Sequence, residues 1–248
     1  MPEDLAHIFA LSDFPRVETR AIAGRLVAVV DDVYRQPDLA RRFALGLDFD
    51  RKAGMYPGRL AGVAGPVESL LRLVNGLVPD STGRSLAIHP DYCDRLTFAV
   101  LSQPGPDLRP LQRQPHFDGF CDFAAVLYLS RPEDCQGGTS FWRHRRTGLE
   151  YAPCRGDLRS AALLESFAAR DEWQLISMMM KDGLAEVGGG YLTESNGRWE
   201  RLDVVEMHCN RLLLYDARLF HSAHVPRPEW RPDPERPRLT QNLYLNRG

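Results

Sequence analysis

One pair of side chains, His116 and Asp118, stands two positions apart shortly before an apolar run. On an extended strand, residues i and i+2 point to the same side, so the imidazole and the carboxylate can converge. With a distant histidine, such a pair makes the two-histidine, one-carboxylate set that holds non-haem Fe(II) and leaves positions open for other ligands. His221 is the candidate third ligand, and His224 is the alternative.

A second pair with the same spacing, His89 and Asp91, encloses Pro90. Proline removes a backbone donor and belongs at strand edges or in turns. We therefore interpret this pair as part of a turn and not as part of a metal site.

Arg238 and Thr240 enter the last apolar run of the chain on one face of a predicted strand. In an apolar barrel such a pair suits a carboxylate, because the guanidinium can bind both of its oxygens. The proline-rich stretch 225–237 precedes them and is predicted to be an extended loop. Three other arginines of this loop compete for the same role: Arg227, Arg231 and Arg236.

The elements that must position these residues are mostly strands, because short β-rich runs dominate the chain from Arg95 onward. The predicted strands cover residues 96–101, 123–129, 139–142, 191–193, 199–205, 212–215 and 239–245. This density is typical of a sandwich or jelly roll. Asn196-Gly197 is the strongest hairpin signal and predicts a type I′ turn. A helical insertion is predicted at about 157–181.

Residues 1–94 are predicted to be a helical buttress packed on one sheet, and residues 95–248 the jelly-roll core of the same single domain. Apolar residues at helical spacing predict two helices over 24–47, broken near Gln36-Pro37. A third helix is predicted to open at Pro66. The predicted fold class is therefore mainly β with flanking helices.

Composition narrows the function classes. The 248 residues, 44% hydrophobic and 26% charged, fit one globular domain. The formal net charge of −2 argues against nucleic acid as a partner. No apolar run spans a bilayer and no basic flank of a signal peptide is present, so a cytoplasmic protein without a membrane partner is expected. Five cysteines without a CxxC spacing predict reduced thiols.

In their order along the chain, these pieces resemble the Fe(II) and 2-oxoglutarate dependent oxygenases, nearest to the prolyl-hydroxylase-like branch. The resemblance covers about residues 95–246. The segments that carry it are Pro104-Gly105, His116-Phe117-Asp118, Tyr128-Leu129, Gly137-Gly138-Thr139-Ser140-Phe141, Asn210-Arg211-Leu212, residues 216–221 and Arg238-Leu239-Thr240. The resemblance implies a double-stranded β-helix, a jelly roll of cupin type, with His116, Asp118 and His221 on Fe(II).

The resemblance also implies a place for the cosubstrate 2-oxoglutarate, with its distal carboxylate held by Arg238, Thr240 and Tyr128. Gln103 is assigned to the inner end of the cosubstrate, where relatives often have tyrosine before the Pro104-Gly105 pair. The stretch between the third metal ligand and Arg238 is longer than usual in the family.

The activity implied is that of a dioxygenase that uses O₂ and 2-oxoglutarate to hydroxylate an unactivated C–H bond. The substrate would be a small molecule, an amino acid or a peptidyl side chain. Asp118 favours hydroxylation, because related halogenases lack this carboxylate. Two alternatives stay open: a cupin-type metalloenzyme that does not use 2-oxoglutarate, and a non-catalytic jelly-roll binding module. A monomer or a homodimer is expected.

Overall fold

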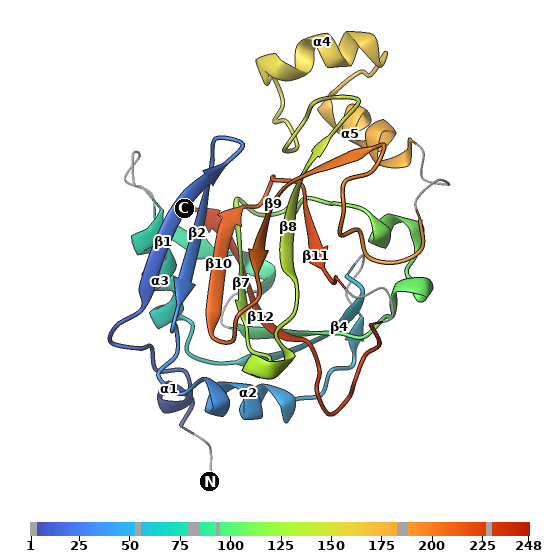
Figure 1. The fold of residues 1–248 in the computed structure, drawn as a ribbon. Coiled ribbons are helices and arrows are strands. Elements are labelled where there is room, and N and C mark those ends of the chain that lie inside the picture. Colours follow the sequence, from blue (N-terminus) through green and yellow to red (C-terminus); the bar gives the residue numbers. More distant parts are fainter. Residues whose placement is uncertain (1–3, 53–55, 79–84, 93–94, 183–187, 227–229) are drawn as a thin grey trace.

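Two antiparallel sheets pack against each other in the computed structural model, which describes residues 4–52, 56–78, 85–92, 95–182, 188–226 and 230–248 (Figure 1). In these residues the large sheet has the order β1-β2-β10-β7-β12-β6-β4-β3, with β5 also paired to β12. Its strands are β1 (Arg16–Ile22), β2 (Arg25–Asp31), β3 (Arg51–Lys52), β4 (Gly58–Ala64), β5 (Leu86–Ile88), β6 (Arg95–Leu101), β7 (Phe123–Tyr128), β10 (Arg211–Asp216) and β12 (Leu239–Arg247). The small sheet has the order β11-β8-β9, with β8 (Gly138–His144), β9 (Trp199–Glu206) and β11 (His221–His224).

The large sheet is buried on both faces, so its strands alternate between two hydrophobic cores. On β12, Leu239, Leu243 and Leu245 pack with the helices, whereas Tyr244 packs toward the small sheet. Successive side chains of a strand point to opposite faces, so Arg238, Thr240 and Asn242 share the face of Tyr244. The last strand therefore presents its polar side chains to the space between the two sheets.

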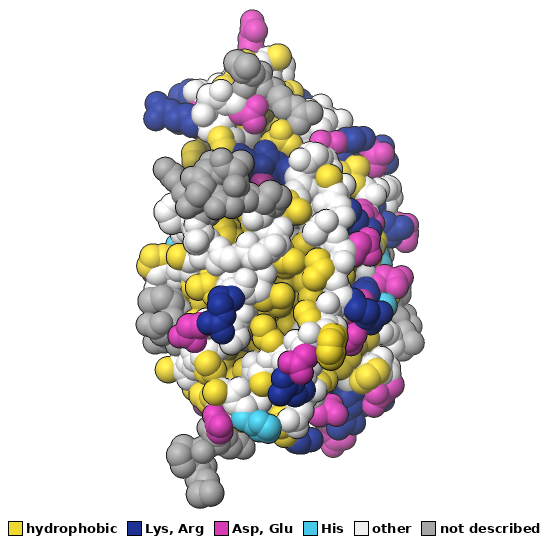
Figure 2. Space-filling view, turned by 90° about the vertical axis from the view of Figure 1, so that its left-hand side faces the viewer, with side chains coloured by type: hydrophobic (Ala, Val, Ile, Leu, Met, Phe, Trp, Pro, Cys, Tyr) yellow, Lys and Arg dark blue, Asp and Glu magenta, His cyan; other side chains and the backbone are white. Residues whose placement is uncertain are grey.

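Helices cover the other face of the large sheet. They are α1 (Leu5–Ile8), α2 (Pro37–Leu45) and α3 (Glu68–Leu77), which contribute Ile8, Ala40, Ala44, Leu70 and Val74 to one core (Figure 1). Two further helices, α4 (Leu158–Ser166) and α5 (Glu172–Lys181), lie beyond one end of β8 and β9. Seen from the side of β1 and α3, hydrophobic side chains gather in the middle of the surface and charged ones along its borders (Figure 2).

The prediction for the first 94 residues is only partly correct. The helices at α2 and α3 are confirmed, but the predicted helix before Gln36-Pro37 is wrong, because this segment forms β2. Val27 and Val29 pack on one face of β2 and Val30 packs on the other, so both faces of this strand are buried. A strand of this kind lacks the alternation of apolar and polar residues that would distinguish it from a helix in the sequence. The region adds five strands to the large sheet and is not a purely helical buttress.

The hairpin prediction at Asn196-Gly197 is also wrong. Residues 191–193 are not a strand, and the Asn196 side chain accepts hydrogen bonds from the backbone N–H groups of Arg198 and Trp199 at 2.8 Å. A two-residue turn with positive φ at both positions lies instead at Ala23-Gly24, where φ is 52° and 72°. Positive φ at both central residues is typical of a type I′ turn.

The remaining core strands and the helical insertion are where the sequence predicts them, except that the insertion forms two helices. The second histidine–aspartate pair lies at a turn, because Pro90 opens a short 3₁₀ helix, as predicted. Among the described residues, no helix is long and apolar enough to cross a bilayer.

Candidate metal centre

The segment that carries His116 and Asp118 lies beside β11, held by backbone hydrogen bonds. His116 N–H donates to His221 O at 2.9 Å, and His221 N–H donates to His116 O at 2.8 Å. Asp118 N–H donates to Ala217 O at 2.8 Å. His116 is in a single bridge and not in a full strand, which differs from the prediction. The antiparallel pairing still brings His116 and Asp118 beside His221, although His221 lies far from them in the sequence.

The three side chains converge. One ligand atom from each of His116, Asp118 and His221 lies within 4.8 Å of the others. Asp118 Oδ2 is 3.5 Å from His221 Nε2, and Asp118 Oδ1 is 4.0 Å from His116 Nε2. The two imidazole rings are 4.4 Å apart between centroids. Two imidazoles and a carboxylate at such distances can hold a divalent transition metal.

Hydrogen bonding fixes the tautomer of His221. Its Nδ1 lies 2.8 Å from Leu219 O, and a carbonyl oxygen can only accept, so Nδ1 carries the proton. Nε2, the ring nitrogen that remains for a metal, faces Asp118 Oδ2 at 3.5 Å. This outer hydrogen bond to a backbone carbonyl is typical of histidines that bind metals. The His221 ring is also packed 4.7 Å from the Tyr215 ring.

Electrostatics keep these groups in the protonation states that bind cations. Burial, and to a smaller extent the nearby His221, lower the pKa of His116 to about 4 against the opposite effect of Asp118. The His116 ring has many protein atoms around it, but 49% of the surface of its side chain is still exposed. Burial alone would raise the pKa of Asp118, but the hydrogen bond from His221 and the positive charges of both histidines, each present when the ring is protonated, bring it below its usual range. The centre thus offers a neutral imidazole beside a carboxylate at neutral pH.

The rival histidine lies elsewhere. His224 ends β11, three residues after His221, and its Nδ1 is 2.8 Å from Ser140 Oγ. It lines a cavity of about 690 Å³ that does not include His116, Asp118 or His221. Of the two histidines left open by the sequence, only His221 lies in the cluster with Asp118.

Arg238 is the residue just before β12. Its side chain is on the face of Thr240 and Asn242, which is directed toward the space between the two sheets. Its Nη1 donates to Gln136 O, and its Nη2 donates to Gly138 O at 2.9 Å. No carboxylate of the described residues pairs with it, and burial lowers its pKa. An arginine carries five N–H donors, so these two carbonyls leave donors for a ligand. A buried cation without a counterion is costly, and an anionic ligand would relieve that cost.

The other residues assigned to the cosubstrate lie near this arginine. Thr240 pairs with Tyr128 across β12 and β7, and the Tyr128 hydroxyl is 2.8 Å from Thr139 Oγ1. Gln103 has a buried Oε1 without a hydrogen-bond partner. Its backbone carbonyl accepts a hydrogen bond from the Tyr191 hydroxyl at 2.7 Å.

The competing arginines of the proline-rich loop are placed differently. Arg236 is exposed and pairs with Asp134, and Arg231 is exposed and donates to Trp230 O. Arg227 lies outside the described residues. Trp230, the neighbour of Arg231, packs 6.1 Å from the Tyr191 ring, but within the described residues no hydrogen bond or ion pair joins either arginine to the tyrosines around Arg238.

Sequence reasoning missed three residues near Arg238. Tyr56 and Tyr191 come from loops, and both are close enough for the guanidinium to lower their pKa values against the larger, opposite effect of burial. Asn242 follows Arg238 and Thr240 at the same two-residue spacing, and its Oδ1 is buried without a partner. That spacing could have identified Asn242, whereas the sequence holds no signal for Tyr56.

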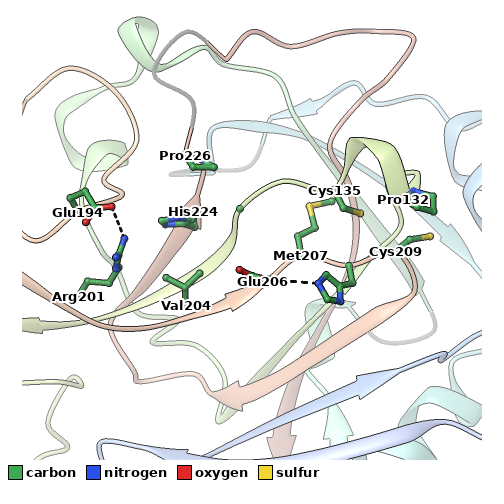
Figure 3. A pocket seen from close by; sticks show the side chains of 12 residues that line it. Pro132, Cys135, Glu194, Arg201, Val204, Glu206, Met207, Cys209, His224 and Pro226 are labelled. Atoms are coloured by element: carbon green, nitrogen blue, oxygen red, sulfur yellow. Dashed lines mark hydrogen bonds and ion pairs between the residues drawn. The ribbon is translucent and has the colours of Figure 1, made fainter.

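The cavity beside His224 is a second candidate pocket, on the outer side of the small sheet (Figure 3). We call it the outer cavity; it is lined by Pro132, Cys135, Gly137, Glu194, Arg201, Val204, Glu206, Met207, His208, Cys209, His224 and Pro226. Arg201 in this cavity pairs with Glu194 at 3.0 Å, and the imidazole of His208 lies 3.8 Å from the carboxylate of Glu206. These pairs leave no described cation in need of a ligand there.

Comparisons with known proteins place the chain in a family. The model of a family described as "Family of unknown function (DUF6445)" matches residues 14–245. No curated protein matches. Among solved structures, the chain is similar to HygX from Streptomyces hygroscopicus with nickel and 2-oxoglutarate bound, at 17% identity over 89% of this chain and 82% of that chain, with a TM-score of 0.44.

Proposed function

Because the chain belongs to a family whose function is unknown, its activity has to be inferred from the site, and we propose that it is an Fe(II) and 2-oxoglutarate dependent dioxygenase. The observation that carries the proposal is the convergence of His116, Asp118 and His221 within 4.8 Å. The substrate class would be a small molecule, an amino acid or a peptidyl side chain with an unactivated C–H bond.

We further infer that the two sheets form a double-stranded β-helix. Four central strands of the large sheet lie in the order β10-β7-β12-β6. The segment at His116 extends the small sheet on the edge of β11, giving the order of this segment, β11, β8 and β9. Four central strands facing three strands and one bridged segment, with spatial neighbours far apart in the chain, support the jelly roll that the resemblance to the prolyl-hydroxylase-like branch implies.

The residues present fit the cofactor and the cosubstrate. Two imidazoles and one carboxylate would hold Fe(II), leaving coordination positions open. The unpaired guanidinium of Arg238 would bind a distal carboxylate, which explains why a cation is buried there without a counterion. The orphaned oxygens of Gln103 and Asn242 point to a polar occupant between the sheets.

Bound Fe(II), with 2-oxoglutarate and O₂, would supply an oxidant able to hydroxylate a C–H bond. The chain's own residues supply orientation. Leu219 O holds the His221 ring with Nε2 toward the metal position, and the low pKa of His116 keeps its imidazole free of a competing proton. Arg238 would fix the far end of the cosubstrate, so that its other end is presented to the three ligands.

A succinate-release assay tests the proposal. Protein reconstituted with Fe(II) under argon and then given 2-oxoglutarate and O₂ should form succinate, and Asp118→Ala should not. Asp91→Ala is the matched control, because Asp91 has the same spacing from a histidine but lies at an exposed turn. Equal succinate from the Asp118 variant would contradict the proposal.

The unpaired Arg238 favours this activity over a cupin-type enzyme that does not use 2-oxoglutarate. Metal binding without succinate formation or 2-oxoglutarate binding would support that alternative. Absence of metal binding would support a non-catalytic binding module.

A further inference from the structure

Tyr56 lies on the same face of the large sheet as Arg238. A Cβ atom added to Gly58 of β4 would stand within 3 Å of both Val100 O of β6 and Tyr56 Cε1, so the tyrosine ring lies against this glycine where β4 meets β6. Gly58 pairs with Leu101 of β6, and Leu101 N–H donates to Arg238 O at 3.1 Å. Val100 packs toward the helices, so Leu101 and the residues beside it point the other way. The Tyr56 ring therefore lies against a residue two strands away from Arg238, and the guanidinium is close enough to lower the pKa of the phenol against the effect of burial.

The three phenols around the guanidinium differ in their hydroxyl partners. The Tyr128 hydroxyl is bonded to Thr139, and the Tyr191 hydroxyl donates to the backbone carbonyl of Gln103. The Tyr56 hydroxyl makes no hydrogen bond to any residue in the described part of the chain. Only this phenol therefore has both of its hydrogen-bonding capacities available to a ligand beside the cation.

Protonation supports a donor role. Burial raises the pKa of Tyr56, and Arg238 opposes this rise only in part. The hydroxyl therefore keeps its proton at neutral pH. A neutral phenol can donate to a carboxylate oxygen, and hydrogen bonds to a charged acceptor are stronger than those between neutral groups.

We propose that the Tyr56 hydroxyl donates a hydrogen bond to the carboxylate held by Arg238 and so selects a cosubstrate that carries a distal carboxylate. The inference rests on the proposed function, and it assigns a cosubstrate contact to a residue outside the segments that resemble the oxygenase family. The loop before β4 then takes part in the site, in addition to the strands of the core.

Calorimetric titrations of the Fe(II)-loaded protein under argon test this assignment. Two ligands are compared: 2-oxoglutarate and 2-oxobutanoate, which shares the 2-oxo acid end but lacks the distal carboxylate. Tyr56→Phe should weaken 2-oxoglutarate binding by about 10- to 100-fold, the scale of one hydrogen bond to a charged group, and leave 2-oxobutanoate and Fe(II) binding unchanged. Tyr34→Phe is the control, because it removes another buried hydroxyl, bonded at 2.7 Å to Gln241 on the helix side.

The outcomes separate two failures. If the wild-type protein binds no 2-oxoglutarate, the proposed function fails. If it binds 2-oxoglutarate and Tyr56→Phe binds it equally well, only the assignment of Tyr56 is overturned. Equal weakening of both ligands would also overturn it, because a structural role predicts no preference between them. A lowered melting temperature in Tyr56→Phe would show that the hydroxyl has a partner within the protein, with the same consequence.

Discussion

The surroundings of Arg238 and the outer cavity each contain an arginine, but the charge of that arginine is compensated in only one of them. In the outer cavity, Arg201 has Glu194 and His208 has Glu206. Arg238 is surrounded by tyrosines and backbone carbonyls, with no carboxylate among the described residues. A buried charge without a counterion is rarely retained for stability alone. The difference indicates that a cavity's volume is a weaker guide to function than an uncompensated charge.

The largest effect is expected at the three converging ligands. Asp118→Ala should lower the affinity for Fe(II) at least about 100-fold, since even residues one layer outside a metal site change affinity by about 10- to 100-fold. Equilibrium dialysis against Fe(II) under argon measures this. Glu206→Ala in the outer cavity should leave the affinity unchanged; loss of metal from this second variant would move the site to the outer cavity.

The two arginines should differ strongly in ligand binding. Arg238→Met should weaken 2-oxoglutarate binding by about 2 to 5 kcal/mol, the scale for truncating one partner of a buried charge pair, while metal binding persists. Arg201→Met, which removes a guanidinium already paired with Glu194, should not change it. Titration of each Fe(II)-loaded variant with 2-oxoglutarate gives the comparison. Equal losses of 2-oxoglutarate affinity in both variants would contradict the assignment of the anion site to Arg238.

A buried histidine outside both regions should control stability at acid pH. Burial and the nearby Arg198 together lower the pKa of His144 to about 4. The folded state therefore takes up this proton less readily than the unfolded chain, so stability is full above about pH 6.5 and falls as the pH drops toward 4. About 2 kcal/mol of unfolding free energy should be lost between pH 7.5 and 5.

Urea unfolding at the two pH values measures this loss, and His144→Gln should reduce it. If the variant loses as much stability as the wild-type protein, another group is responsible. Binding of metal and 2-oxoglutarate at pH 7.5 should be the same in both, because His144 packs against Trp199, away from the metal ligands.

The smallest effect is expected from the ion pairs of the outer cavity. Glu206 and His208 are 3.8 Å apart with side chains 75% and 54% exposed. Exposed pairs contribute little, so Glu206→Ala should change the free energy of unfolding by less than about 0.5 kcal/mol. Urea unfolding measures this change. A loss of unfolding free energy several times larger would mean that Glu206 stabilises the fold through contacts other than this exposed pair.

The core strands and the three converging residues could be predicted from sequence because each left a local signal. Short apolar runs mark β7, β10 and β12, and the spacing of His116 and Asp118 places two ligands on one side of an extended segment. The choice of His221 over His224 could not be settled locally, since both lie on β11. Only the pairing of His221 with His116 in the fold separates them.

Other features depend on contacts that no local pattern encodes. The segment before Gln36 carries β-branched residues that serve a helix face or a doubly buried strand equally well, and its partner β10 lies far along the chain. Tyr56 shows the same limit at the site. Its position relative to Arg238 follows from the pairing of β4 with β6, and a single tyrosine in a loop gives no sequence signal for that pairing.

The central claim, that this chain holds Fe(II) and 2-oxoglutarate together, is tested most directly by an anaerobic absorption titration. Fe(II) added to the apoprotein should give no visible band, and 2-oxoglutarate added next should give a metal-to-ligand charge-transfer band that saturates with one metal per chain. The band should be absent from Asp118→Ala. A wild-type protein that binds Fe(II) yet shows no such band at saturating 2-oxoglutarate would contradict the account.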